Sequence, residues 1–137
     1  MIDSRWTKKD ELIDILMDLK HDLGKYVFLH LSHLTTDSPA DMIEEALHAA
    51  LFETRKIGVE HQSAEQIWLR YKSEIDALDY PFGGYERLVN AANETLAMKR
   101  FLTSGGESAP PHVGQIQKIA RGISETIMQI IEEEQGE

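Results

Sequence analysis

The chain of 137 residues contains no cysteine. Disulfide frameworks, thiolate zinc sites, iron–sulfur clusters and cysteine nucleophiles are therefore excluded. Long apolar runs are also missing, because the longest stretches, such as residues 49–52, have about four residues. A helix that crosses a bilayer needs about 20. No membrane partner is expected.

Basic residues are few compared with acidic ones, 14 against 24, which gives a formal net charge of −10. A negative field of this size repels nucleic acid and anionic membrane surfaces, so neither is expected as a partner. The first residues lack the apolar core and cleavage site of a signal peptide, which predicts a cytoplasmic protein. A chain of this length fits one domain, residues 1–137, with a core that needs no cross-links.

Alternation of polar and apolar residues with a period of two is absent over any useful length, so no strand is predicted. Apolar residues instead recur at steps of three and four. Short connections between such segments are typical of an antiparallel bundle. The sequence therefore predicts an all-α antiparallel bundle of four or five helices, at approximately residues 7–34, 39–57, 63–79, 84–103 and 110–134.

Several helix boundaries carry recognisable signals. Thr7 with Asp10, and Ser63 with Gln66, have the spacing of a capping box at a helix start. Gly58 is expected to end the second helix. The last helix shows a heptad seam, which predicts a buried face: Val113, Ile116, Ala120, Ile123, Ile127 and Ile130.

Residues 7–34 form one apolar stripe when drawn as a regular α-helix at 100° per residue. His21 lies almost opposite this stripe, near Asp14, Asp18 and Lys25, and is expected to face solvent. The stripe predicts which side chains are buried: Leu12, Leu16, Leu19, Leu23, Tyr26, His30 and Leu34.

A second set of side chains falls on the same outer side as His21: Met17, Gly24, Phe28 and Leu31. Exposed apolar residues beside a glycine, which lowers the local surface, indicate a docking strip for a protein partner. Together with the heptad seam of the last helix, this strip also favours a homodimer.

The segment that holds His21 resembles the phosphoacceptor helix of the histidine phosphotransfer family over about a dozen residues. Sensor kinases place a hydrophobic pair before an exposed histidine, followed by an acidic and a leucine-like residue, as in 15–16 and 21–23. Free-standing phosphotransfer domains have His-x-Leu-Lys-Gly, whereas residues 21–25 read His-Asp-Leu-Gly-Lys. A proline common in sensor kinases is replaced by Tyr26.

This resemblance implies roles for three residues. His21 would attack an aspartyl phosphate, Asp22 would orient or deprotonate its imidazole, and Lys25 would stabilise the phosphoryl group. Because the chain contains no ATP-binding motif, it would act as a relay component.

The same five residues resemble the central motif of HD-type metal-dependent phosphohydrolases, which often reads His-Asp-Leu-Gly-Lys. Those enzymes need another histidine on a helix well upstream, and none precedes His21. Their His-Asp pair also points into a buried metal site, whereas His21 is expected to face solvent.

Two other pairs have metal-ligand spacing: His30-x-x-His33 and Glu45-x-x-His48. A carboxylate-bridged site needs a second Glu-x-x-His and further glutamates, which the sequence lacks. His30 is interpreted as a core histidine near a helix end. No metal site and no cofactor is predicted.

The sequence therefore predicts a non-enzymatic protein-interaction domain. A phosphotransfer domain that uses His21 is the first alternative, and a degenerate HD-type phosphohydrolase is the second. The first alternative requires an exposed His21 with a cation in reach, and the second requires His21 and Asp22 to converge with other metal ligands.

Overall fold

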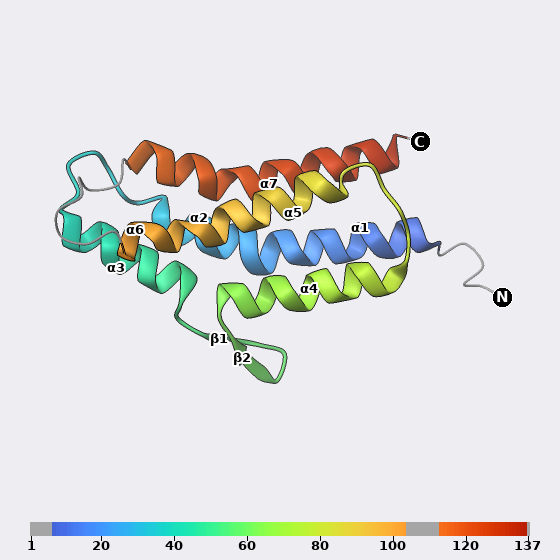
Figure 1. Cartoon of the computed structure of the whole chain (residues 1–137), viewed down its shortest axis with the longest axis horizontal. Coiled ribbons are helices and arrows are strands. Elements are labelled where there is room, and N and C mark those ends of the chain that lie inside the picture. The colour runs from blue at the N-terminus through green and yellow to red at the C-terminus, as the bar shows by residue number, and fades with distance from the viewer. Residues whose placement is uncertain (1–6, 104–112, 137) are drawn as a thin grey trace.

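A computed structural model of the chain describes residues 7–103 and 113–136. Within these ranges five helices pack together, and a small β-hairpin lies at the side of the bundle (Figure 1). The predicted all-α bundle is confirmed. No helix in the described ranges is both long and apolar enough to span a bilayer.

The first helix is continuous but changes its geometry midway. It consists of α1 (Lys8–Leu19), a π-helical segment η2 (Lys20–Lys25) and α2 (Tyr26–Leu31). The predicted capping box is confirmed, because the backbone N of Thr7 lies 2.9 Å from Asp10 Oδ2 and the backbone N of Asp10 lies 3.2 Å from Thr7 Oγ1. This helix packs against α4 and α7 (Figure 1).

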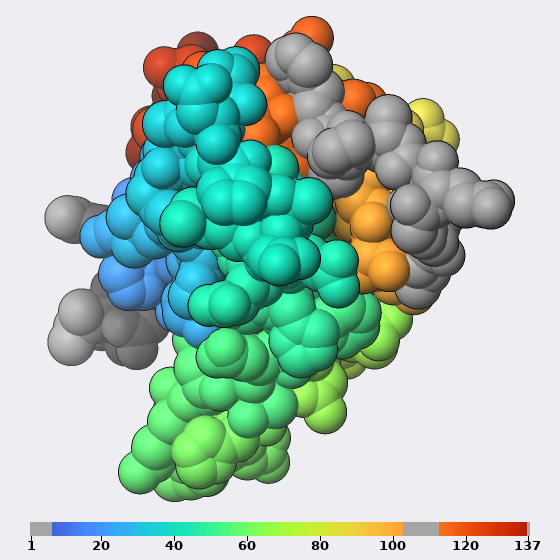
Figure 2. Space-filling view, turned by 90° about the vertical axis from the view of Figure 1, so that its left-hand side faces the viewer, coloured from blue at the N-terminus to red at the C-terminus, as the bar shows by residue number. Residues whose placement is uncertain are grey.

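The second predicted helix, 39–57, is wrong in its last six residues, because α3 spans Ala40–Leu51 and a hairpin follows. Strands β1 (Arg55–Ile57) and β2 (Glu60–Gln62) pair antiparallel, and Figure 2 shows them projecting from the bundle. Gly58, with φ +67°, begins the two-residue turn rather than ending a helix. Strands of three residues are too short to reveal a period of two.

The third predicted helix is confirmed as α4 (Ala64–Leu78). Its start carries the expected signal, because the backbone N of Ser63 donates to Gln66 Oε1 at 2.8 Å. Asp79 ends it in the left-handed conformation, with φ 53°.

The fourth predicted helix appears as three joined pieces: α5 (Tyr85–Leu96), a 3₁₀ turn η3 (Ala97–Lys99) and α6 (Arg100–Thr103). The last helix, α7 (Val113–Gln135), is confirmed, and all six residues of its predicted seam are buried. The predicted start of this helix at residues 110–112 lies outside the described residues.

Helix α7 runs antiparallel to the first helix and closes its end. Gln117 Nε2 donates to the carbonyl oxygens of Leu31, at 3.1 Å, and Leu34, at 2.9 Å. These carbonyls lie at the end of the first helix, where fewer partners within the helix are available, and the Leu31 oxygen also accepts from the backbone N of Leu34 at 3.2 Å. The contact with Gln117 therefore ties α7 to the end of the first helix.

Candidate functional site

The π-helical segment η2 contains the motif His-Asp-Leu-Gly-Lys and shifts the phase of the whole first helix. Val27 and Leu31 are fully buried, whereas Tyr26 and His30, predicted in their place, are half-buried. Hydrogen bonds from i to i+5 place more residues in each turn than an α-helix does. A projection at 100° per residue therefore places the buried positions about one residue too early after Leu23. For this reason the predicted burial of Tyr26 and His30 is wrong.

The same shift corrects the predicted docking strip. Leu31 is 0% exposed and Gly24 is buried, so their expected exposure is wrong. Phe28 is half-buried, whereas Met17 is 47% exposed as expected. The exposed apolar residue beyond η2 is instead Leu29, at 57%.

We call the exposed residues that follow one another at steps of four along this helix the outer strip: Met17, His21, Lys25 and Leu29. Residues four apart are neighbours on a helix surface. The outer strip keeps one residue of the predicted docking strip, Met17, and two of the predicted phosphotransfer residues, His21 and Lys25.

The motif residues between His21 and Lys25 have structural partners. Leu23 is 1% exposed and belongs to the core. Gly24 faces α7 so closely that a Cβ at this position would lie 2.5 Å from Ser124 Oγ. Because these two residues face the bundle, His21 and Lys25 remain on its surface.

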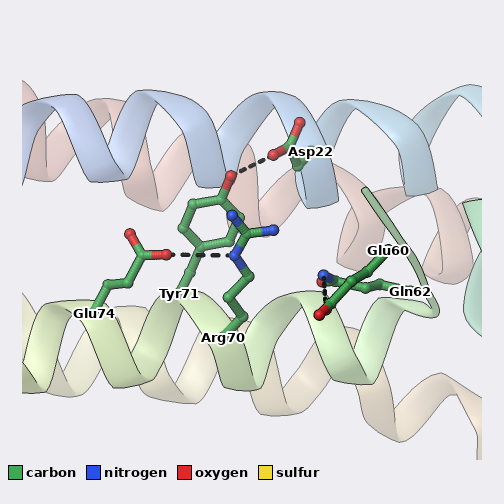
Figure 3. A network of polar contacts seen from close by, with 6 residues as sticks. All are labelled: Asp22, Glu60, Gln62, Arg70, Tyr71 and Glu74. Carbon is green, nitrogen blue, oxygen red and sulfur yellow. Dashed lines mark hydrogen bonds and ion pairs between the residues drawn. The ribbon is translucent and has the colours of Figure 1, made fainter. Parts of the chain in front are cut away.

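Asp22 is held by α4. The Tyr71 hydroxyl group donates a hydrogen bond to Asp22 Oδ2, and Figure 3 shows Tyr71 reaching from α4 to η2. Burial raises the pKa of Tyr71 above its ordinary value of 10.0, and the hydrogen bond to Asp22 raises it further. Asp22 therefore has a partner other than His21, the residue that it was predicted to orient.

Asp18, about one turn earlier, interacts electrostatically with His21. Burial and the nearby carboxylates of Asp14 and Asp22 raise the pKa of Asp18, and His21 lowers it. The surroundings of His21 are thus acidic on the α1 side, while Lys25 supplies positive charge on the α2 side.

The hairpin is anchored at the junction of η2 and α2. The Arg55 guanidinium carbon lies 3.4 Å from the centroid of the Tyr26 ring, a cation–π contact. Burial lowers the pKa of Arg55, against the opposing effects of Tyr26, Asp22 and Tyr71. Sequence reasoning missed Arg55 and Tyr71 because no local pattern indicates that a hairpin and α4 meet this segment.

The other histidines form no metal centre among residues 7–103 and 113–136, where no three His, Asp or Glu side chains converge on a metal position. His30 packs edge-on against Tyr26 with ring centroids 4.6 Å apart, and His33 is exposed. Glu45 and His48 line a surface groove on α3. The convergence of His21 and Asp22 with other ligands, as an HD-type centre requires, is not seen in the described chain.

Replacing Tyr71 with Phe should make the stability less sensitive to high pH. A raised pKa in the folded state means that the stabilisation by the neutral Tyr71 hydroxyl is complete below the unfolded pKa of about 10 and is lost as the pH rises through the folded pKa. Urea unfolding between about pH 8 and pH 11 measures this. If the free energy of unfolding changed equally with pH in the native protein and in Tyr71→Phe, the hydrogen bond between Tyr71 and Asp22 would be contradicted.

Comparisons of the chain with protein-family models, with curated proteins and with solved structures find no match. No relative therefore supplies a function.

Proposed function

We propose that this protein is a non-enzymatic interaction domain and that the outer strip is its recognition surface. The observation that carries the proposal is the exposure of Met17, at 47%, and Leu29, at 57%, on one helix with His21 and Lys25 between them. Exposed large apolar side chains on the same side of a helix as polar ones can contact a protein partner.

The rest of the fold holds this helix firmly. Its inner side is buried along its length, from Leu12 to Leu31, and η2 is joined to α4 through Tyr71 and to the hairpin through the contact of Arg55 with Tyr26. A surface that is ordered before binding loses less conformational entropy on association. Local π-helical geometry is also frequent at functional sites.

Photo-crosslinking tests the proposal. Leu29 is replaced by benzoylphenylalanine, and in a matched protein Leu69, which is 56% exposed on α4, is replaced instead. We expect a covalent protein adduct from position 29 in cells that express the chain, and its loss on adding Met17→Glu. Equal adduct yields from positions 29 and 69, or no effect of Met17→Glu, would contradict the proposal.

A second candidate function is phosphotransfer through His21. It is supported by the exposure of His21 and by Lys25, which lies four residues further on the same side. An imidazole nitrogen would attack the phosphorus of an aspartyl phosphate, the carboxylate would leave, and Lys25 would balance the charge of the phosphoryl group. Asp22, occupied by Tyr71, would hold η2 in place rather than activate His21.

Intact mass after incubation with phosphoramidate tests this candidate. We expect one acid-labile phosphoryl group on the native chain, none on His21→Ala, and an unchanged yield on His33→Ala, whose imidazole is also exposed. An unmodified native chain, or equal labelling of the two variants, would contradict phosphotransfer without affecting the interaction proposal.

A further inference from the structure

We infer that the partner of the outer strip is a second copy of this chain, packed antiparallel across a two-fold axis. This inference rests on the proposed function, because it names the occupant of the same surface. In such a dimer one patch meets itself, so every contact between two different residues occurs twice. The surface must therefore be complementary to its own reverse.

One pair of opposite charges, Asp18 and Lys25, meets that requirement, whereas Asp14 would lie at the level of Leu29 of the other copy. Asp14 and Asp18 are exposed on α1, before His21, and Lys25 is exposed after it. An axis at the level midway between residues 18 and 25 would place Asp18 of each copy opposite Lys25 of the other. A parallel arrangement would instead place each charge against its own kind.

The apolar residues of the outer strip follow the same symmetry. Met17 lies before the axis and Leu29 after it. Met17 of each copy would therefore lie within about one helical turn of Leu29 of the other copy. Both are exposed in the single chain, and dimerisation would remove both from water. His21 would lie near the axis.

The small contact area and the net charge of the chain predict a weak dimer. A contact between two helices falls toward the lower end of interface sizes, where complexes are transient. Each copy also has a formal charge of −10, so the two bodies repel one another at long range. At about 0.15 M salt this repulsion is screened beyond about 8 Å, while direct ion pairs still act.

Sedimentation equilibrium of the purified full chain, at concentrations up to about 1 mM, is the experiment. We expect a concentration-dependent dimer of the native protein. Asp18→Lys and Lys25→Asp should each weaken dimerisation about tenfold, because each creates two like-charge pairs. The double variant Asp18→Lys, Lys25→Asp restores both pairs and should dimerise to within about threefold of the native chain.

The exposed pair of Lys72 and Asp76 on α4, joined at 2.9 Å, offers a matched control. Exchanging these two charges should leave the dimerisation constant unchanged, and circular dichroism checks that every variant is folded. A native chain that stays monomeric, or a double variant as weak as the single ones, would overturn the inference.

The outcomes also separate this inference from the proposed function. A monomeric chain that still forms a specific adduct from position 29 with a different protein overturns the second copy as partner and leaves the interaction domain intact. A monomeric chain without any specific adduct overturns both. An adduct of twice the mass of the chain, lost in the single charge variants and regained in the double, supports both.

Discussion

Deletion of Lys25 should leave the protein folded, with a free energy of unfolding within about 1 kcal/mol of the native value. The π-helical segment η2 contains one residue more than an α-helix would need to connect the buried residues of α1 with those of α2. Removing that residue brings Val27 and Leu31 to the positions that an α-helix turns toward the core. We therefore expect η2 to become α-helical while the packing on both sides is kept.

The matched deletion of Glu125, also exposed but in the regular helix α7, should abolish cooperative folding. This deletion rotates the residues after position 125 by 100° about the helix axis, which removes Ile127, Ile130 and Ile131 from the core. Burial of each isoleucine contributes about 1.5–3 kcal/mol, so their sum approaches the total stability of a typical domain. Urea unfolding followed by circular dichroism measures both deletions. Equal loss of structure in the two would contradict the extra-residue interpretation of η2.

Gly24→Leu should lower the free energy of unfolding by about 3 kcal/mol, which corresponds to a fall in Tm on the order of 10 °C. At this position α7 lies so close that even a Cβ would meet Ser124 Oγ at 2.5 Å, and the Cγ2 atom of Ile123 lies 3.6 Å away. A leucine side chain has no free volume there, so α7 must move away from η2. Thermal unfolding measures the effect.

Two alanine variants show whether the close approach is responsible. Gly24→Ala should be nearly neutral, because the Ser124 hydroxyl can rotate away and alanine favours the helix. Gly122→Ala, where no side chain or other segment beyond the neighbouring residues lies within 4 Å of the added Cβ, should stabilise the protein by about 0.5–1 kcal/mol. A Gly24→Leu protein with the native Tm would show that η2 and α7 are not in contact at this point.

Local signals accounted for much of the fold. The capping boxes at Thr7 and Ser63 have the predicted hydrogen bonds, and the heptad seam of α7 is buried throughout. These features depend on residues within a few positions of one another, so they can be recognised in the sequence. The hairpin after α3 was missed for the opposite reason: its strands are too short to show a pattern, and their position depends on the contact of Arg55 with Tyr26.

The candidate site was predictable in part. The exposure of His21 follows from helical periodicity, since this residue precedes the point where the phase error becomes large. Lys25 follows that point, but it lies far enough from the buried side to stay exposed after a shift of about one residue. The predicted exposure of Gly24 and Leu31 is wrong, and the exposure of Leu29 is not predicted, because η2 has more residues per turn than the 3.6 of an α-helix. The hydrogen bond between Asp22 and Tyr71 could not be predicted from the local pattern, because the two residues are 49 positions apart in the sequence.

By itself, the sequence determined the helical class, most helix positions and the buried seam of α7, because hydrophobic periodicity and capping act over a few residues. The tertiary structure decided the π-helical turn at η2, the burial of Gly24 against Ser124 and the holding of Asp22 by Tyr71. These depend on how α4 and α7 pack against the first helix. When the apolar side of the helix is buried up to Leu23, Val27 and Leu31 can join the same core only if the helix widens at η2. This widening leaves the outer strip exposed: Met17, His21, Lys25 and Leu29.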